Sequence, residues 1–470
     1  MSRMASKAVI KRKLLILTLV AVIIFVLVAP GCVSVPGGGA FFQASVINDG
    51  SGGAIVVYEI RENGDNRNAY IQRIDAEGNK LWGERGKLLG VSIHSPLIAS
   101  DGFGNAIAAW WQQGDIVAQK IDPEGHMLWQ EGVPIFTNIK GFYWKKIVSD
   151  GFGGAIFCLS SGGAGKNLYV QKVNSEGQLL WIKDGKSVCL EAGVEDMPFS
   201  FDIASDNSGG SVVVWKKRAS GIFVQRIDSE GNALWKQGGL EVSTPRSYNP
   251  RVIGDGSGGA ITVWEHFEEN EEGQQISSIY AQRVDAEGNI LWRQGGLPVY
   301  SSLELPISNP QIVSDGSGDA IITWYTHNDI YAQKIDFDGN IQWSKDGVKV
   351  QGSEGLQAPH CVIADGSGGA IIAFERRSGS IRESAGLCYV QELDATGRSQ
   401  WQPDGTLVST KRCHPIISDD GSGGAVIICW PYVQRINAQG ERMWGEKGIL
   451  LSRGDILGCF WPFAQKIFCL

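Results

Sequence analysis

NPRVIGDGSGGAITVW (249–264) and IYAQRVDAEGNILW (279–292) are the two halves of a unit that decides the fold. Both halves recur along the chain. The copies of the glycine motif are NDGSGGAI (48–55), SDGFGNAI (100–107), SDGFGGAI (149–156), SDNSGGSV (205–212), GDGSGGAI (254–261), SDGSGDAI (314–321), ADGSGGAI (364–371) and DDGSGGAV (419–426). Because the same unit is written eight times, the chain of 470 residues is read as one repeat domain.

Each unit is predicted to form four short antiparallel strands, because runs rich in Val, Ile, Tyr and Trp alternate with turn residues. The third strand contains the YAQRID run, and the fourth is expected to start at the Leu-Trp pair. A repeat of about 50 residues made of four strands is typical of a β-propeller. The sequence therefore predicts an all-β, eight-bladed β-propeller over residues 41–454, preceded by an N-terminal signal or anchor segment.

The glycine motif is interpreted as a turn between the first and second strands. Its aspartate can accept bonds from its own downstream backbone, and its glycines can adopt positive φ. A phosphate-binding loop would lead into a helix, and no copy is followed by a helical pattern. A calcium loop needs several carboxylates, whereas each copy usually offers one.

The segment IDAEGNxLW resembles the tryptophan-docking motif of the PQQ-like eight-bladed propellers, here with a turn that is one residue shorter. The resemblance covers about a quarter of each unit and occurs in all eight. It implies that the closing tryptophan locks each blade against its neighbour. It implies no quinone, because relatives of this shape include a lipoprotein that acts as a scaffold, and we expect no cofactor. The docking tryptophans are Trp82, Trp129, Trp181, Trp235, Trp292, Trp343, Trp401 and Trp444.

A second ladder of large residues follows the alanine of the second strand by four positions. Its regular placement predicts packing between blades. The ladder consists of Trp110, Trp215, Trp264 and Trp324, with Tyr58, Leu159, Phe374 and Cys429 in the other blades.

The first 32 residues read as an export signal. A basic head precedes the apolar run LLILTLVAVIIFVLV (14–28), which is short for a membrane span and suits a secretory signal. The run ends in APGC at Cys32, which resembles the lipidation signal of bacterial lipoproteins. Cleavage elsewhere, or an uncleaved anchor, are the alternatives. We expect an extracytoplasmic protein, anchored in the membrane of the bacterial cell envelope.

Two further segments flank the propeller. VSVPGGG, within residues 33–40, is read as a tether, and residues 455–470 as a tail or a truncated ninth repeat. The net charge of −8, with no basic cluster outside the head, argues against a nucleic-acid partner. The cysteines contain no CxxC pair, so we expect no zinc site. The protein is expected to be a monomer.

Binding is expected where the repeats differ, which is in the loops between the second and third strands and in the connections between blades. The loop EHFEENEEGQQISS (265–278) is the longest and is rich in glutamate, and ERRSGSIRESAGL (375–387) is more basic. GFYW (141–144) offers aromatic side chains for a sugar or a protein segment. The candidate binding residues are Phe142, Tyr143, Trp144, His266, Phe267, Arg376 and Arg377.

Catalysis finds little support in the sequence. The six histidines form no ligand pair, and no GxSxG or paired carboxylates stand out. His94, His360 and His414 precede the first strands of their units, so a metal at the channel mouth is an alternative. We expect a protein that is not an enzyme, a binding scaffold for a protein partner. A carbohydrate-binding propeller is the alternative, and a metal- or quinone-dependent enzyme ranks last.

Overall fold

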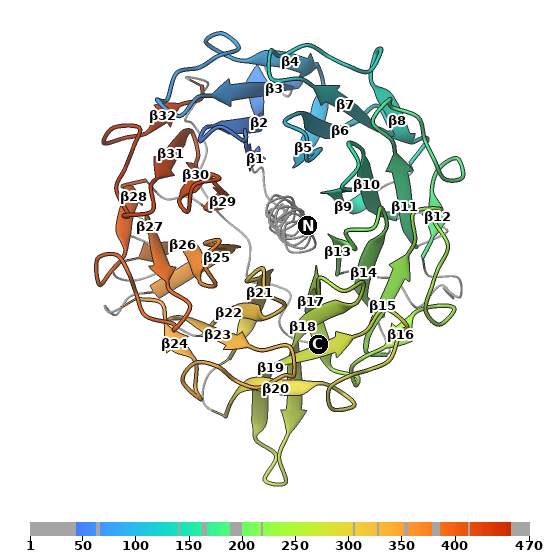
Figure 1. The fold of residues 1–470 in the computed structure, drawn as a ribbon, viewed down its shortest axis with the longest axis vertical. Coiled ribbons are helices and arrows are strands. Elements are labelled where there is room, and N and C mark those ends of the chain that lie inside the picture. The colour runs from blue at the N-terminus through green and yellow to red at the C-terminus, as the bar shows by residue number, and fades with distance from the viewer. Residues whose placement is uncertain are drawn as a thin grey trace, which may run out of the picture.

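The computed structural model describes residues 44–62, 66–139, 142–161, 167–188, 200–217, 220–303, 306–326, 329–351, 356–377, 386–411 and 414–452. These residues form eight four-stranded sheets arranged as the blades of a ring, which confirms the predicted fold class (Figure 1). Blade 1 contains β1–β4, and the numbering continues to blade 8 with β29–β32. The expected signal, Cys32, the tether and the tail lie outside the described residues.

Strand order within every blade follows chain order, and neighbouring strands are antiparallel. The first strands lie nearest the ring axis: β1 (Ala44–Asn48), β5 (Ile93–Ser100), β9 (Phe142–Ser149), β13 (Phe201–Ser205), β17 (Ser247–Gly254), β21 (Ser308–Ser314), β25 (Leu356–Ala364) and β29 (Ile416–Asp419). The second strands are β2 (Ala54–Glu62), β6 (Ala106–Gln112), β10 (Ala155–Ser161), β14 (Ser211–Lys216), β18 (Ala260–Glu269), β22 (Ala320–Tyr325), β26 (Ala370–Arg377) and β30 (Ala425–Cys429).

The third strands are β3 (Asn66–Ile74), β7 (Asp115–Ile121), β11 (Leu168–Val173), β15 (Ile222–Ile227), β19 (Gln275–Val284), β23 (Ile330–Ile335), β27 (Gly386–Leu393) and β31 (Tyr432–Ile436). The outermost strands are short: β4 (Lys87–Gly90), β8 (Val133–Phe136), β12 (Lys186–Ser187), β16 (Leu240–Glu241), β20 (Leu297–Ser302), β24 (Val348–Lys349), β28 (Thr406–Ser409) and β32 (Ile449–Leu450). Among the described residues, no helix is long and apolar enough to span a bilayer.

The hydrophobic core lies between blades rather than inside one layer. Each of eight clusters of buried side chains joins two neighbouring blades, and the cluster between blades 8 and 1 closes the ring. The second ladder contributes to these clusters: Trp215, Trp264 and Trp324 are completely buried. Each blade is built from one continuous segment, so the ring closes without a swapped strand.

The docking tryptophans join neighbouring blades at every boundary. Trp235 of blade 4 donates its indole N–H to the carbonyl of Ala286, in a turn of blade 5, at 3.0 Å. Gly288 of that turn has a φ of 90°, and a Cβ there would lie 2.8 Å from the Trp235 ring, so only glycine fits. Trp444 makes the same bond to Ala76 of blade 1. The remaining pairs are Trp82–Pro123, Trp129–Ser175, Trp181–Ser229, Trp292–Phe337, Trp343–Ala395 and Trp401–Ala438.

The expectation that the outermost strand starts at the Leu-Trp pair is wrong. In blade 5, Trp292 lies in a turn, and β20 begins only at Leu297. The side chain of Gln282 holds this turn: its Oε1 accepts the N–H of Trp292 at 3.1 Å, and its Nε2 donates to the carbonyl of Arg293 at 2.7 Å. The same glutamine occupies the third strand of all eight blades and accepts the N–H of the docking tryptophan each time.

The glycine motif forms the structural turn that the sequence predicts. In blade 5, Oδ1 of Asp255 accepts the N–H groups of Ser257 at 2.9 Å and Gly259 at 2.8 Å. A Cβ on Gly259 would lie 2.3 Å from the carbonyl oxygen of Val284, which excludes any larger residue. The second carboxylate oxygen of Asp255 lies 2.8 Å from Arg283 of the third strand. The backbone N–H groups of Ser257 and Gly259 and the carboxylate of Asp255 are therefore already paired within the blade.

Replacing a docking tryptophan should weaken the whole ring. We expect Trp235→Ala to lower the free energy of unfolding by about 3–5 kcal/mol, because it leaves a cavity between blades and an unpaired turn carbonyl. Urea unfolding followed by circular dichroism measures this change. The control is Leu234→Ala, since Leu234 is 46% exposed, and it should change the free energy by about 0.5 kcal/mol or less. Equal effects of both substitutions would contradict the docking role.

Candidate binding surfaces

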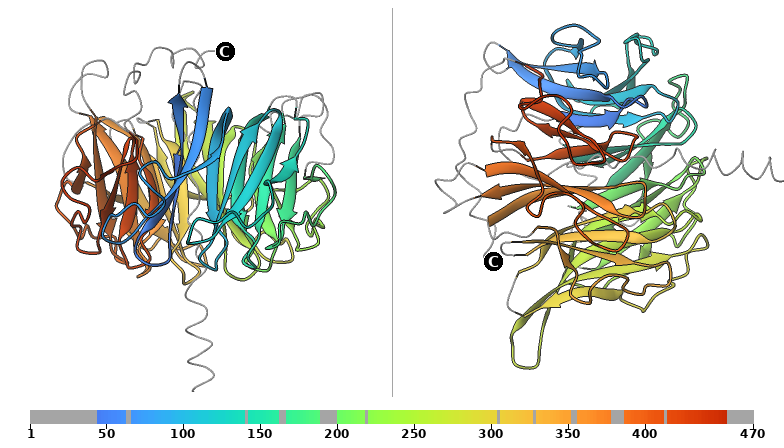
Figure 2. Two further views of the ribbon diagram at one scale, coloured as in Figure 1. Left: turned by 90° about the horizontal axis from the view of Figure 1, so that it is seen from above. Right: turned by 60° about the vertical axis from the view of Figure 1, so that its left-hand side comes forward.

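The ring has two unlike faces, because strands cross from one to the other (Figure 2). The turns that follow the first and third strands, such as 254–260 and 285–289, are short and alike in all blades. The other face carries the connections between the second and third strands and between blades, and these differ in length. We call these faces the turn face and the loop face.

The most distinctive element of the loop face is a long hairpin in blade 5, formed by β18 and β19. Its strands pair from Ala260↔Val284 to Glu269↔Gln275. Figure 1 shows that its end projects beyond the outline of the ring. The region expected to be a loop, 265–278, is therefore mostly strand. We call residues 268–275 the hairpin tip.

The hairpin tip is an ordered turn with exposed carboxylates. Oδ1 of Asn270 accepts the N–H groups of Glu272 at 3.1 Å and Gln274 at 2.8 Å. Glu268, Glu269, Glu271 and Glu272 are all exposed. Glu269 pairs with Arg246 at 3.1 Å, a bond in which both side chains are more than half exposed and which contributes little. The tip therefore carries an excess of negative charge toward solvent.

Two predicted binding residues lie at the base of this hairpin. His266 is 9% exposed, its Nδ1 lies 3.1 Å from the hydroxyl of Ser247, and its ring packs edge-on against Tyr280. Burial lowers the pKa of His266, so the ring is held neutral. Phe267 packs against Tyr248. These side chains brace the hairpin, and little of His266 is accessible to a ligand.

The other predicted binding residues are not brought together with the hairpin. The guanidinium of Arg376 lies over the ring of Tyr389 at 4.5 Å and 3.5 Å from Asp404, within blade 7. The side chain of Arg377 lies outside the described residues. The same holds for the side chains of Phe142, Tyr143 and Trp144, whose backbone begins β9.

The histidines proposed for the channel mouth show separate environments. The ring of His94 packs against Trp111 of its own blade. His360 is buried with its Nε2 at 2.9 Å from Thr323, and burial lowers its pKa to about 4. The contacts of His94 and His360 are those of separate packing residues rather than of a shared ligand set.

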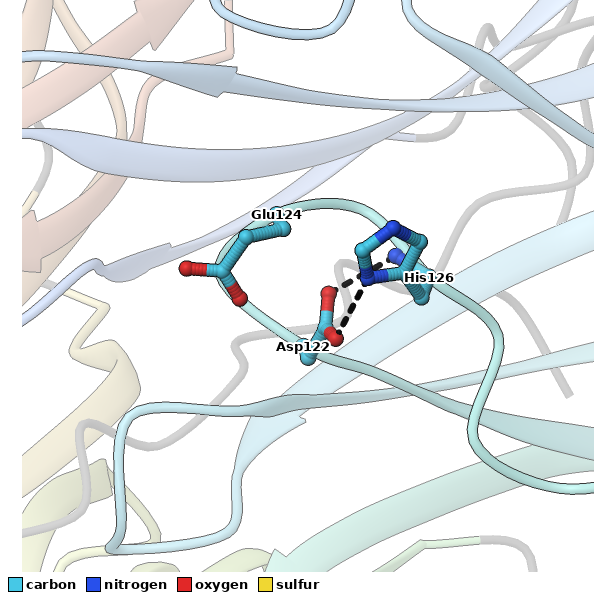
Figure 3. A group of neighbouring side chains, drawn as sticks. All are labelled: Asp122, Glu124 and His126. Atoms are coloured by element: carbon cyan, nitrogen blue, oxygen red, sulfur yellow. Dashed lines mark hydrogen bonds and ion pairs between the residues drawn. The ribbon is translucent and has the colours of Figure 1, made fainter.

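One group among the described residues has the spacing of a metal site: Asp122, Glu124 and His126 in a turn of blade 2 (Figure 3). Nδ1 of His126 lies 2.8 Å from Oδ2 of Asp122. In four other blades an asparagine at the same turn position donates to the same aspartate oxygen, at 2.9–3.0 Å. His126 thus replaces an amide that braces the turn, and the group is a structural turn.

Several buried charges near the inner strands were not anticipated from the sequence. Glu265 accepts bonds from Nδ2 of Asn249 at 2.9 Å and from the N–H of Asn309, in the next blade, at 2.6 Å. Desolvation raises the pKa of Glu265. Lys145 is buried on β9, and desolvation lowers its pKa to about 7. Aligning the repeats singles out Lys145, because most other blades carry proline or another apolar residue there, whereas the position of Glu265 is charged in blades 1, 4 and 7 as well.

The boundary between blades 7 and 8 contains a cleft of about 380 Å³ on the turn face. Trp401 forms part of its wall and is the docking tryptophan that is least buried. Polar groups dominate the rest of the lining, which consists of Gln400, Gln402, Pro403, Thr406, Gln439, Gly440 and Glu441.

Comparisons with known proteins support the fold at low sequence identity. No protein-family description matches the sequence, and no curated protein does. The solved BP39L lectin from Burkholderia pseudomallei is 11% identical, with a TM-score of 0.50 over 78% of this chain and 99% of that chain. The polysaccharide lyase Uly1 is 10% identical, with a TM-score of 0.44 over 77% of this chain and 91% of that chain. Membership of the PQQ-like repeat family therefore remains a resemblance.

The expectation that the chain is not an enzyme is corrected by this comparison. The solved structures that it resembles include Uly1 and a GH43 endo-arabinanase from Bacillus licheniformis, which is 14% identical with a TM-score of 0.27 over 53% of this chain and 96% of that chain. The missing motifs gave no ground for excluding catalysis, and that exclusion is withdrawn.

The structural reading of the blade 2 turn predicts the behaviour of His126. We expect His126→Asn to leave the melting temperature unchanged, because an amide makes this bond in four other blades. His126→Ala should lower the free energy of unfolding by about 0.5–1.5 kcal/mol. Thermal unfolding with and without EDTA measures both. A melting temperature that falls in EDTA for the natural chain, and not for His126→Asn, would instead identify a metal site.

Proposed function

We propose that this protein is exported, anchored in the bacterial cell envelope through its N-terminal segment, and binds a protein partner with the acidic hairpin of blade 5. The observation that carries this proposal is the projection of an ordered, charged hairpin from an otherwise regular ring (Figure 1). A hairpin that only connected two strands could be as short as that of blade 8, where Cys429 pairs with Tyr432.

Order at the hairpin tip favours binding over a role as solvated filler. The turn at Asn270 and the packing of His266 and Phe267 fix the hairpin before any partner arrives. Preorganisation lowers the entropy lost on association. The export part of the proposal is supported by the basic head of the sequence and the apolar run 14–28.

The charge of the tip indicates the chemistry of the partner. Four exposed glutamates with one weak internal counter-charge would attract a surface rich in lysine and arginine. Such pairs raise the association rate and are screened by salt. Binding should therefore weaken as the ionic strength rises.

Crosslinking in intact cells tests this proposal. A tagged natural chain should capture a specific envelope protein, and a variant in which 266–278 is replaced by a short Gly-Asn turn should lose it. The substitutions Glu268→Gln, Glu269→Gln, Glu271→Gln and Glu272→Gln, made together, should reduce capture at low salt by tenfold or more. Quantitative mass spectrometry of the captured proteins provides the measurement.

The matched control removes four carboxylates from the turn face. It combines Glu77→Gln, Glu124→Gln, Glu176→Gln and Glu287→Gln, all of which are exposed on turns after third strands. This control should capture the partner as the natural chain does. If it loses the partner equally, net charge rather than the hairpin explains the binding, and the proposal fails.

Carbohydrate binding is the second candidate, and the cleft between blades 7 and 8 favours it. An indole with amide, hydroxyl and carboxylate groups around it matches the mixed apolar and polar surface of a sugar. The BP39L structure, whose fold this chain resembles, bears the name of a lectin.

Glycan-array binding tests this candidate. We expect Gln402→Ala and Glu441→Ala together to abolish any glycan signal, because both side chains are exposed in the cleft and neither docks a blade. The control is Lys236→Ala, which changes the position equivalent to Gln402 in blade 4. A glycan signal that survives the double substitution would place sugar binding elsewhere on the ring.

A further inference from the structure

Seven of the eight blades pair the turn aspartate with a cation on the third strand. The distances between nitrogen and carboxylate oxygen run from 2.8 to 3.4 Å. The pairs are Asp49–Arg73, Asp101–Lys120, Asp150–Lys172, Asp206–Arg226, Asp255–Arg283, Asp315–Lys334 and Asp420–Arg435.

The same cation also joins its blade to the next one. In blade 2, Nζ of Lys120 donates to the carbonyl of Gly153 in blade 3 at 2.8 Å. Six of the seven cations make such a bond, and Lys334 of blade 6 makes it to Gly368 of blade 7. One positive charge therefore neutralises a buried carboxylate and crosses a blade boundary.

Blade 7 breaks this pattern, because Glu392 stands where the cation belongs. Asp365 of the same blade is 7% exposed, and it accepts the N–H groups of Ser367 and Gly369 like the aspartates of the other blades. A carboxyl group is thus brought beside a buried carboxylate. Two such groups repel when both are ionised.

The charged surroundings of Glu392 do not supply the missing cation. Within blade 7, Asp365 and Asp394 both act on it, and Asp394 is itself bonded to the turn at Arg398. From blade 6, Lys334 is held by Asp315 at 2.8 Å and by Asp319 at 3.7 Å. From blade 8, Asp420 and Arg435 are paired with each other at 2.9 Å. The indole of Trp401, whose N–H donates to the carbonyl of Ala438 in blade 8, also lies beside Glu392.

We propose that the Glu392–Asp365 pair makes the packing between blades 7 and 8 depend on pH. The two blades pack tightly when Glu392 is protonated and less tightly when it is ionised. An ionised carboxylate has no proton to donate to a carbonyl, so Glu392 cannot make the bond to the next blade that six of the cations make. The boundary is the one that contains the cleft beside Trp401. Ionisation, with release of the proton to solvent, places two negative charges side by side there.

The direction of the pH effect follows from the pKa of Glu392. Desolvation, with the charges of Asp365 and Asp394, raises this pKa from its ordinary value of 4.5 to about 7. The folded chain then binds the proton more tightly than the unfolded chain does. This group therefore favours folding most below about pH 4.5, and the contribution is lost as the pH rises toward 7.

Thermal unfolding between about pH 5 and pH 8 tests the proposal with Glu392→Gln and Glu392→Arg. As the pH rises, the melting temperature of the natural chain should fall relative to that of Glu392→Gln, which cannot ionise. Glu392→Arg restores the cation of the other blades and should melt higher than the natural chain at pH 8. Glu77→Gln, on an exposed turn, should follow the natural chain at every pH.

Hydrogen exchange locates the effect. Raising the pH from 6 to 8 should increase the opening of the turns of blades 7 and 8, after correction for the intrinsic rate, and leave blades 3 and 4 unchanged. Parallel melting profiles for the natural chain and Glu392→Gln would overturn the proposal, as would uniform exchange around the ring. Since Glu392→Gln adds no bulk, the test stands even if Glu392→Arg does not fold.

Discussion

The rest of the structure depends on a bond between an indole N–H in one blade and a turn carbonyl in the next. It fixes the distance between neighbouring blades at their outer ends, while the apolar clusters hold them together further in. The turn can approach the indole face because its glycine has no side chain. The side chain of Gln225 accepts the backbone N–H of Trp235. This bond positions the indole before the next blade packs on it. Eight equal steps of this kind make a closed ring.

A ring held in this way leaves few positions free to change. The bonds of its aspartate fill the first turn, and the third strand presents the glutamine in all eight blades and the cation in seven. Variation is therefore concentrated where it does not disturb docking. The hairpin of blade 5 grows outward from strands that are already paired, and blade 7 changes a charge without changing the path of its backbone.

The sequence predicts the architecture because the docking motif is local. Trp292, its turn and the strand before it lie within 14 residues, so eight copies can be recognised and counted. Prediction from the sequence fails where a side chain makes its decisive contacts outside this local pattern. The bonds of Gln282 hold Trp292 in a turn outside the outer strand, and contacts with Ser247 and Tyr280 bury His266. The absence of a catalytic motif, finally, does not by itself exclude an activity.

The closure of the ring has a consequence for how the chain is made. The bond from Trp444 to Ala76 joins residues 368 positions apart. Blade 1 therefore lacks this contact until blade 8 has formed. Blades 2 to 7 can each dock on the blade made just before, whereas the turn of blade 1 stays uncovered until the last blade has been synthesised. A chain that crosses a membrane from its N-terminus would thus arrive with an open edge. A product stopped before residue 431 would keep that edge, and expose the indole of Trp401 as well.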